Sequence, residues 1–370
     1  MTDQDYMRRA IELAKQGIGW TNPNPLVGAV IVKNGRVIGE GAHLRCGTLH
    51  AERNALLACT EDPAGATIYV TLEPCCHYGR TPPCTEIIIE KKLARVVIGS
   101  RDPNPKVSGK GAALLRAHGI LVEEDFLKEE CDALNPIFFH YITTGLPYTA
   151  SKFAMTLDGK IASRTGASQW ITGETARRHV HALRGRYAAI LVGIGTVLAD
   201  DPMLNCRLPD AHQPLRIVLD SGLRIPEDSA LCRTARQYPT MVVCAEDLPE
   251  KRERLCALGV RVEYLPDADG RPDLSRLCLL LGREGIDSLL IEGGGSIHEA
   301  AFRAGIVNHV FAYIAPKIMG GKDAKSPVEG RGAAHPDHAA QLSYCGMQSL
   351  GEDLLLEYDV KEAMRCSPEL

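Results

Sequence analysis

Short runs of β-branched and other apolar residues alternate with segments of helical spacing through both halves of this chain. The runs expected to form buried strands are 66–73, 94–100, 188–193, 215–221 and 241–247. Strands that alternate with helices form layered α/β domains with a parallel or mixed sheet. A Gly/Pro turn at 143–148 divides the pattern. The sequence therefore predicts two α/β domains, residues 1–145 and 147–362.

Several local patterns add detail to this organisation. Asn34-Gly35 stands between two apolar runs, which is a strong signal for a β-hairpin. Helices are expected at 3–16, from His50 onward, after Cys84 and at 173–185. Residues 287–305 are typical of a strand, a glycine loop and a helix in succession.

Composition and charge exclude several classes of protein. The 370 residues are 45% hydrophobic and 24% charged, which suits two globular cores, and the net charge of −4 argues against a general nucleic-acid surface. The N-terminus has charges throughout and no secretory apolar region, and the apolar run at 188–199 is too short to span a membrane. The 13 cysteines are expected to be reduced thiols, and we expect a cytoplasmic protein.

Residues 71–84, "TLEPCCHYGRTPPC", place three cysteines and a histidine close together. Upstream, His50-Ala51-Glu52 has the form of a ligating histidine followed by a non-ligating glutamate. Zinc deaminases combine this pair with a Pro-Cys and a second cysteine. Pro74-Cys75 supplies the first cysteine, but the position three residues later is Tyr78. The nearest plausible partner is Cys84, across a longer loop.

Two features favour Cys84 over Cys76 as that partner. Adjacent cysteines point in divergent directions, so Cys75 and Cys76 rarely share one metal ion. "TPPCTE" also has the form of a helix start with Thr81 as a possible cap, and a helix N-terminus favours the thiolate form of a cysteine.

We interpret His50, Cys75 and Cys84 as the ligands of a catalytic zinc and Glu52 as its acid–base residue. Two alternatives remain open at this point. One is a closed structural zinc site with Cys76 or His77 as a fourth ligand. The other is a set of buried thiols without any metal.

The second half contains the glycine run "IEGGGSIHEA" at 291–300, where a strand is expected to meet a helix. Backbone N–H groups at such a junction can bind phosphate. The run fails the G-x-G-x-x-G pattern because His298 occupies the position of the third glycine. This argues against a Rossmann domain.

These motifs together closely resemble the bifunctional deaminase–reductases of riboflavin biosynthesis, the RibD type. The first half shares "NPNPLVGAV" (22–30), "HAE" and "TLEPCCHYGRTPPC", and the second shares "KFAMTLDGKIA" (152–162), "SQWITG" (168–173), "VGIGTVLADDPMLNCR" (192–207) and "IEGGGSIHEAAF" (291–302). The resemblance implies an N-terminal cytidine-deaminase-like three-layer α/β/α domain and a C-terminal dihydrofolate-reductase-like α/β domain. Cys76 and Asn205 stand where the family more often has serine and threonine.

The resemblance also implies the chemistry of the first domain. Its substrate would be a diaminopyrimidinone carrying a ribosyl 5-phosphate, deaminated by zinc-activated water with one Zn²⁺ per domain and with Glu52 carrying the protons. Asn24 would bind the pyrimidine edge. His43, His77 and Arg80 could contact the base or the phosphate.

For the second domain the resemblance implies NADPH-dependent reduction of the ribosyl group to a ribityl chain. The expected cofactor contacts are Ala154, Trp170, Thr196, Asp200, Ser221 and the loop Gly294, Gly295, Ser296, Ile297, His298, Glu299 and Ala300, with Arg224 near the extra phosphate of NADPH. The expected substrate contacts are Lys152, Ser168, Arg184, Leu204, Arg207 and Glu292, with Arg184 and Arg207 on the phosphate. A homo-oligomer, dimer or tetramer, is the family expectation.

Other functions predict different features. A nucleic-acid deaminase would have a basic groove and no second domain. A zinc-stabilised binding module would not need Glu52 or an open ligand position. The main alternative is a zinc nucleotide or nucleobase deaminase whose reductase-like domain is inactive or differently specific.

Overall fold

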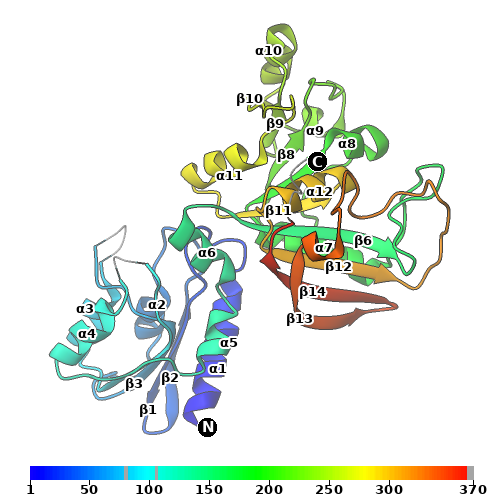
Figure 1. Cartoon of the computed structure of the whole chain (residues 1–370). Coiled ribbons are helices and arrows are strands. Elements are labelled where there is room, and N and C mark those ends of the chain that lie inside the picture. The colour runs from blue at the N-terminus through cyan, green and yellow to red at the C-terminus, as the bar shows by residue number, and fades with distance from the viewer. Residues whose placement is uncertain (79–81, 105–106, 365–370) are drawn as a thin grey trace. The chain divides into compact units, whose positions relative to one another are not determined.

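The structure is a computed structural model that describes residues 1–78, 82–104 and 107–364. The chain divides into two compact units, Met1–Gly145 and Leu146–Leu370 (Figure 1). Each unit has its own sheet and its own hydrophobic core. The two units are therefore described in turn.

In the part of the chain that the structure describes, the N-terminal unit contains one five-stranded sheet with the order β2-β1-β3-β4-β5. β1 pairs antiparallel with both β2 and β3, whereas β3, β4 and β5 run parallel. The strands are β1 (Gly28–Lys33), β2 (Arg36–Ala42), β3 (Thr67–Leu72), β4 (Arg95–Ser100) and β5 (Leu121–Glu123). The helices are α1 (Asp3–Ala14), the short 3-10 helix Lys15–Gly17, α2 (Ala51–Leu57), α3 (Cys84–Glu90), α4 (Lys110–Ala117), α5 (Lys128–Asp132) and α6 (Pro136–Thr144).

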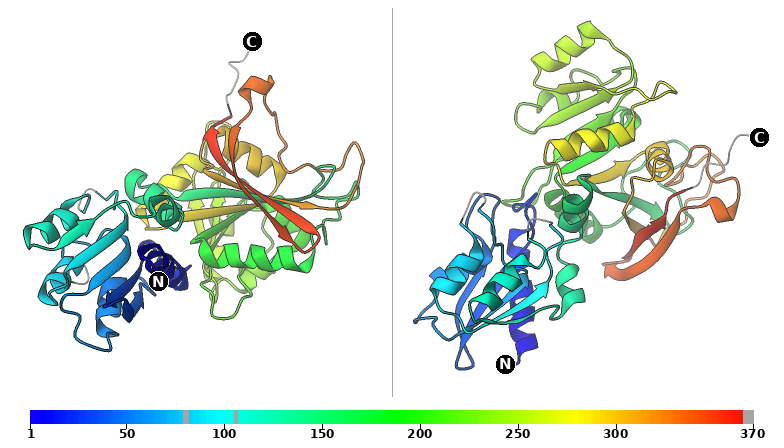
Figure 2. Two further views of the ribbon diagram at one scale, coloured as in Figure 1. Left: turned by 90° about the horizontal axis from the view of Figure 1, so that it is seen from below. Right: turned by 60° about the vertical axis from the view of Figure 1, so that its left-hand side comes forward.

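Helices cover both faces of this sheet, so the unit has three layers (Figure 2). Ile31 and Ile68 point to the face covered by α2, α3 and α4. Their neighbours Val30 and Tyr69 point to the opposite face, against α1 and α5. This alternation follows from the two-residue period of a strand, and it explains why both faces are apolar. The predicted three-layer α/β/α architecture is confirmed.

The predicted hairpin joins β1 to β2. Asn34 and Gly35 both have positive φ angles, 53° and 74°, as a two-residue turn of type I′ requires. The start of α1 is capped as well, because the side chain and backbone of Thr2 exchange hydrogen bonds with Asp5.

Within the described residues, the C-terminal unit contains one nine-stranded sheet with the order β10-β9-β8-β7-β11-β6-β12-β14-β13. The strands are β6 (Tyr148–Thr156), β7 (Ala189–Gly193), β8 (Leu215–Leu219), β9 (Thr240–Cys244), β10 (Arg261–Tyr264), β11 (Ser288–Gly293), β12 (His309–Ala315), β13 (Gln341–Leu350) and β14 (Asp353–Glu362). The helices are α7 (Glu174–Arg186), α8 (Ile194–Asp200), α9 (Ala230–Arg233), α10 (Pro249–Ala257), α11 (Leu274–Arg283), α12 (Gly295–Arg303) and the 3-10 helix Pro336–His338.

The strands from β10 to β12 run parallel, and only β14 and β13 continue the sheet in antiparallel pairing. Leu191 and Ile217 face α11 and α12, whereas Ile190 and Val218 face α8, α9 and α10. The dihydrofolate-reductase-like assignment is confirmed, with the sheet mixed by its last two strands.

Some elements differ from the sequence expectations. α6 was not expected, although it runs into the predicted turn and ends at Gly145, whose φ of 72° lies in the left-handed region. The hairpin of β13 and β14 was also missed. α3 starts at Cys84, and Pro83 immediately before it occupies the N-cap position. Thr81, the proposed cap, lies outside the described residues.

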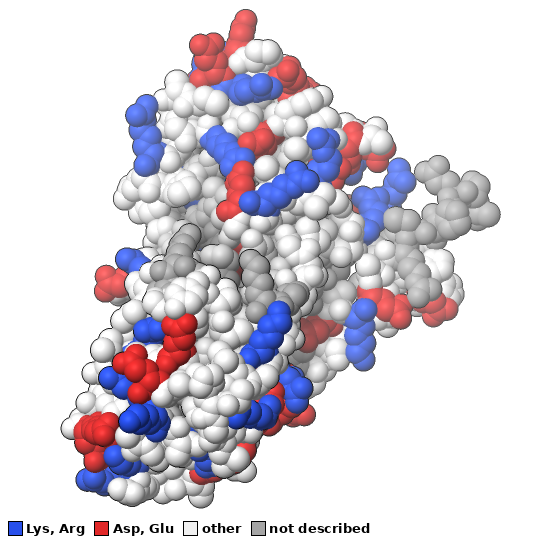
Figure 3. Space-filling view, turned by 90° about the vertical axis from the view of Figure 1, so that its left-hand side faces the viewer, with Lys and Arg blue, Asp and Glu red and all other residues white. Residues whose placement is uncertain are grey.

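The surface carries charges of both signs. On the face that Figure 3 shows, Lys and Arg side chains are interspersed with Asp and Glu, and the described residues form no broad basic patch there. Within the described residues, every helix falls short of the length and apolar character that a membrane span requires.

Candidate active sites

The three predicted zinc ligands come from the starts of two helices and from the loop after one strand. His50 immediately precedes α2, and Cys84 is the first residue of α3. Cys75 follows the end of β3. The backbone N–H and the hydroxyl of Thr85 both donate to the carbonyl of Cys75, at 3.2 Å each, so the loop is fixed against the start of α3.

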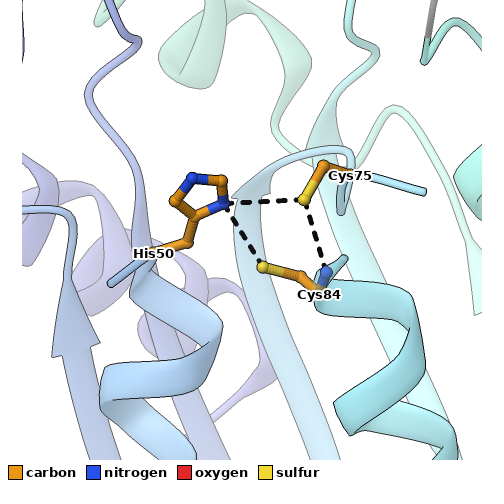
Figure 4. A group of neighbouring side chains, drawn as sticks. All are labelled: His50, Cys75 and Cys84. Atoms are coloured by element: carbon orange, nitrogen blue, oxygen red, sulfur yellow. Dashed lines mark hydrogen bonds between the residues drawn. The ribbon is translucent and has the colours of Figure 1, made fainter. Parts of the chain in front are cut away.

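The side chains of these ligands converge on one point (Figure 4). Nδ1 of His50 lies 3.5 Å from Sγ of Cys75 and 3.4 Å from Sγ of Cys84. The ligand atoms of all three lie within 4.8 Å of one another. One imidazole and two thiols form a donor set that suits zinc, which takes three protein ligands in open sites.

The electrostatics of the two thiols also suit a cation. Hydrogen bonds from Cys84 and His50 outweigh burial and lower the pKa of Cys75 to about 4. The hydrogen bond between Cys84 and Cys75, together with burial, raises the pKa of Cys84. A divalent cation bound by both sulfur atoms would favour the thiolate form of each. In addition, the backbone N–H of Cys84 donates to Sγ of Cys75 at 3.3 Å.

Glu52, the predicted acid–base residue, lies in the first turn of α2 and is 3% exposed. Burial raises its pKa, and the negative charge of Cys75 raises it further. The carboxyl group lines a cavity of about 400 Å³ together with His50 and Cys75. A buried carboxyl group beside the ligands has the position that a proton carrier needs.

The same cavity contains several of the predicted substrate contacts. Asn24, His43 and His77 line it, as does Cys46. His43 is buried, and burial lowers its pKa. Its Nδ1 lies 3.1 Å from the carbonyl of Leu49, so the ring donates there and its Nε2 accepts from the side-chain amide of Asn24 at 3.2 Å. Arg80 lies outside the described residues.

Sequence reasoning missed other residues of this cavity. Asp102 and Asn104 line its wall from the loop after β4, and Tyr141 lines it from α6. Burial raises the pKa of Asp102 to about 6. Asp102 and Asn104 follow β4, which runs parallel to β3. That position could have indicated these two residues, because the carboxyl ends of neighbouring parallel strands share one edge of the sheet.

In the C-terminal unit, the predicted cofactor contacts gather at one edge of the sheet. β8, β7, β11 and β6 are consecutive parallel strands. Ala154 lies near the end of β6, and Ser221 and Gly294 follow β8 and β11. Thr196 and Asp200 lie on α8, the helix that follows β7. The carboxyl edge of a parallel sheet is the usual place for a ligand in such folds.

A buried ionic cluster stands beside this edge. Arg184 of α7 makes two hydrogen bonds to Glu292 of β11, at 2.7 and 2.8 Å. Nζ of Lys152 lies 3.9 Å from the same carboxylate and 5.6 Å from the ring centre of Tyr313. Burial alone would raise the pKa of Glu292, but Arg184 and Lys152 outweigh it and lower that pKa to about 2. Burial lowers the pKa of Lys152.

Other predicted contacts lie on loops nearby. The hydroxyl of Ser168 donates to Asp200 at 3.2 Å. Trp170 is 62% exposed, and the guanidinium of Arg177 stacks 4.5 Å from its ring centre. Arg207 and Arg224 are exposed. Leu204 has a φ of 50° and its side chain is buried in the core, so it can meet a substrate only through its backbone.

The glycine run forms the predicted junction of strand and helix, with Gly294 at a φ of 85° just before α12. Ile297 packs against Gly193, where an added Cβ would lie 2.9 Å from it. The side chains of His298 and Glu299 point into the protein: His298 Nδ1 lies 2.8 Å from Ser151 Oγ, and Glu299 is 3% exposed. At these two positions only the backbone remains for the predicted cofactor contacts.

Comparisons with known proteins agree across both units. Residues 1–100 match the cytidine and deoxycytidylate deaminase zinc-binding region, and residues 147–356 match the RibD C-terminal domain. The riboflavin biosynthesis protein RibD of Actinobacillus pleuropneumoniae is 57% identical over 360 residues, which cover 97% of this chain and 96% of that protein. The chain belongs to the RibD family. RibD of Escherichia coli is 40% identical and is covered over 99% of its length.

Solved structures of RibD proteins match along the same length. RibD of Acinetobacter baumannii superposes with a TM-score of 0.86 at 36% identity, covering 97% of this chain and 99% of that one. A Thermotoga maritima protein described as a diaminohydroxyphosphoribosylaminopyrimidine deaminase and 5-amino-6-(5-phosphoribosylamino)uracil reductase gives a TM-score of 0.84 at 38% identity, covering 96% of this chain and 98% of that one.

As a RibD-family member with a zinc-binding deaminase region and a reductase domain, the chain is a bifunctional enzyme of riboflavin biosynthesis. The alternative, a zinc nucleotide or nucleobase deaminase whose reductase-like domain is inactive or differently specific, is not favoured, because the relatives match over nearly the whole chain. In the deaminase half, the ligand atoms that converge among the described residues are those of His50, Cys75 and Cys84. Neither Cys76 nor His77 joins them.

Proposed function

We propose that residues 1–145 hydrolyse the exocyclic amine of 2,5-diamino-6-ribosylamino-4(3H)-pyrimidinone 5′-phosphate, giving 5-amino-6-(5-phosphoribosylamino)uracil and ammonia. Residues 147–362 then use NADPH to reduce the ribosyl group of that product to a ribityl chain. The description of the Thermotoga maritima protein supports these substrates. Family membership over the whole length supports assigning both steps to one chain.

The observation that carries the first step is the convergence of His50, Cys75 and Cys84 beside the buried carboxyl group of Glu52. Zinc held by these three residues would supply Lewis acidity and lower the pKa of a water molecule at its open position. Glu52 takes the proton of that water, delivers it to the ring nitrogen, and assists the departure of ammonia. Asn24, oriented by His43, binds the edge of the pyrimidine.

In the second step, the residues at the carboxyl edge formed by β6, β11, β7 and β8 would hold the cofactor. NADPH supplies a hydride to the anomeric carbon in its open form. The N–H groups at the start of α12, at Gly295 and Ser296, would bind a phosphate of the cofactor. Lys152 acts on the ribosyl oxygen from within the buried cluster of Glu292 and Arg184, and Arg207 binds the phosphate of the substrate.

We also propose that the chain works as a homo-oligomer, a dimer or a tetramer, as expected for its family. Light scattering of the purified protein measures this directly. A mass equal to one chain at working concentration would reject the proposal.

The function is tested by incubating the purified protein with the diaminopyrimidine ribotide, with and without NADPH. Ammonia release and the loss of NADPH absorbance are followed separately. Ammonia is expected without NADPH, and NADPH oxidation is expected only after deamination. No ammonia from zinc-loaded protein would reject the first assignment.

A pair of variants assigns the first step to its site. Glu52→Gln is expected to abolish ammonia release while zinc stays bound and the deaminated ribotide is still reduced. The matched control is Glu90→Gln, an exposed glutamate of the same unit, which is expected to behave as the wild type. Normal turnover in Glu52→Gln would contradict the role given to Glu52.

A further inference from the structure

A second set of metal-ligating side chains lies at the far end of the C-terminal sheet. One ligand atom each from His309, Cys345 and Asp359 lies within 4.8 Å of the other two. The ligand atoms of His50, Cys75 and Cys84 meet the same limit. The three residues lie on β12, β13 and β14, which are neighbours in the sheet (Figure 1).

The sheet register explains why they meet. His309 is directly opposite Asp359 in the pairing of β12 with β14, and Ser343 is opposite Asp359 in the pairing of β13 with β14. The register of β13 then shifts between Tyr344 and Gly346, which leaves Cys345 as the extra residue of a bulge. A bulge redirects a side chain that a regular strand would align differently. In β13 the bulge occurs at Cys345, whose thiol belongs to this set.

The histidine is held as a metal ligand usually is. His309 is only 9% exposed, and its Nδ1 lies 2.7 Å from Oδ1 of Asp359. Its other nitrogen, Nε2, is buried and makes no aligned hydrogen bond to any described residue, but it lies 3.4 Å from Oε2 of Glu357. A ligating histidine normally directs its second ring nitrogen to a carboxylate, which fixes the ring and its tautomer. Glu357 is in place to do this.

The chemistry of the set selects the cation. We propose that His309, Cys345 and Asp359 form a second metal site, specific for zinc or a similar divalent transition metal such as cobalt or cadmium. Magnesium and calcium prefer oxygen ligands only, whereas an imidazole, a thiolate and a carboxylate together suit zinc. Ligand atoms around tetrahedral zinc stand roughly 3 to 4 Å apart. Small side-chain rotations therefore close the site.

This site is independent of the deaminase zinc and of the proposed reaction. Its ligands join the last two strands, β13 and β14, to β12. A bound cation would therefore cross-link the antiparallel end of the sheet and stabilise it, because a ligand that binds only the folded state adds to stability.

The test counts metal ions and identifies their ligands. Full-length wild type, Cys345→Ser and Cys256→Ser are stripped, equilibrated with Zn²⁺, desalted and analysed for zinc. Cys256 is the matched control, because it is another exposed cysteine of the same unit. We expect one zinc fewer per chain in Cys345→Ser than in the wild type and in Cys256→Ser. Equal zinc in all three proteins would overturn the proposal.

Cobalt provides a second readout. With the deaminase site first filled with one equivalent of Zn²⁺, added Co²⁺ is expected to give a thiolate-to-cobalt absorption band in the wild type and in Cys256→Ser. Cys345→Ser should lose this band and bind the cation at least about 100-fold more weakly, since even the partners of ligands contribute 10- to 100-fold. Asp359→Asn, which keeps the thiol, should also weaken binding. A band that persists in Cys345→Ser would reject the site.

Discussion

The buried pair of Glu292 and Arg184 gives a prediction whose size follows from the structure. Replacing Glu292 with glutamine removes the negative charge that faces two buried cations, Arg184 at 2.7 and 2.8 Å and Lys152 at 3.9 Å. The side chains of Glu292 and Arg184 are only 6% and 14% exposed. Breaking a buried pair by removing one partner typically costs about 3–5 kcal/mol, because it leaves the other charge uncompensated.

The pKa of Glu292 gives an independent magnitude. It falls from 4.5 to about 2 on folding, which corresponds to roughly 3 kcal/mol of stability. Because the folded-state pKa is the lower one, this contribution is complete above the unfolded value and is lost as the pH falls toward the folded value. The stability difference between wild type and Glu292→Gln should therefore be constant above about pH 5 and shrink below it.

The assay must report on the C-terminal unit alone, since two units need not unfold together. Hydrogen exchange of peptides from β6 and β11, measured across a urea series, gives the local free energy of unfolding. The matched control is Glu284→Gln. Glu284 also makes two hydrogen bonds to one arginine, Arg261, at 2.6 and 2.7 Å, but on the surface. An exposed pair contributes less than about 1 kcal/mol. Equal losses in the two variants would refute the reasoning.

Three further predictions concern the two active sites. Arg207→Ala should raise the KM for the deaminated ribotide far more than the KM for NADPH, and equal effects in steady-state assays would argue against its phosphate role. Gly41→Ala should destabilise the deaminase unit by about 1–3 kcal/mol or more and weaken zinc binding, because the new Cβ would lie 2.3 Å from the backbone N of Ala55 in α2, the helix that begins after His50. The control in thermal unfolding and zinc titration is Gly195→Ala in the C-terminal unit, where no atom of the described residues lies within 4 Å of the added Cβ. Removing zinc with a chelator should stop ammonia release and leave reduction of the deaminated ribotide intact, and a simultaneous loss of both activities would contradict the separation of the two sites.

The sequence was most informative where local chemistry is strict. Asn34-Gly35 predicted the hairpin because few other residues accept positive φ at both positions. The glycine run predicted a junction of strand and helix, which the structure confirms. The hairpin of β13 and β14 escaped prediction because β13 is largely exposed and has no clear alternation of buried and exposed residues.

The residues of the candidate sites could also be predicted from the sequence only in part. The pattern of His50, Glu52, Cys75 and Cys84 could be proposed from residue types and spacing, since zinc accepts few donor sets. The sequence could not show that the side chains of His298 and Glu299 turn inward, or that Arg184 is bound by Glu292. Such outcomes depend on which elements pack together over long separations in the chain.

The sequence by itself determined the two α/β units and the family and predicted a candidate zinc donor set, because apolar periodicity, turn chemistry and metal preference act over short stretches of residues. Only the tertiary structure decided which loops line the deaminase cavity, how Glu292 is held between two cations, and that a bulge in β13 brings Cys345 to His309 and Asp359. Those features arise from strand register and from packing between distant segments, and neither is encoded in any single stretch of the chain.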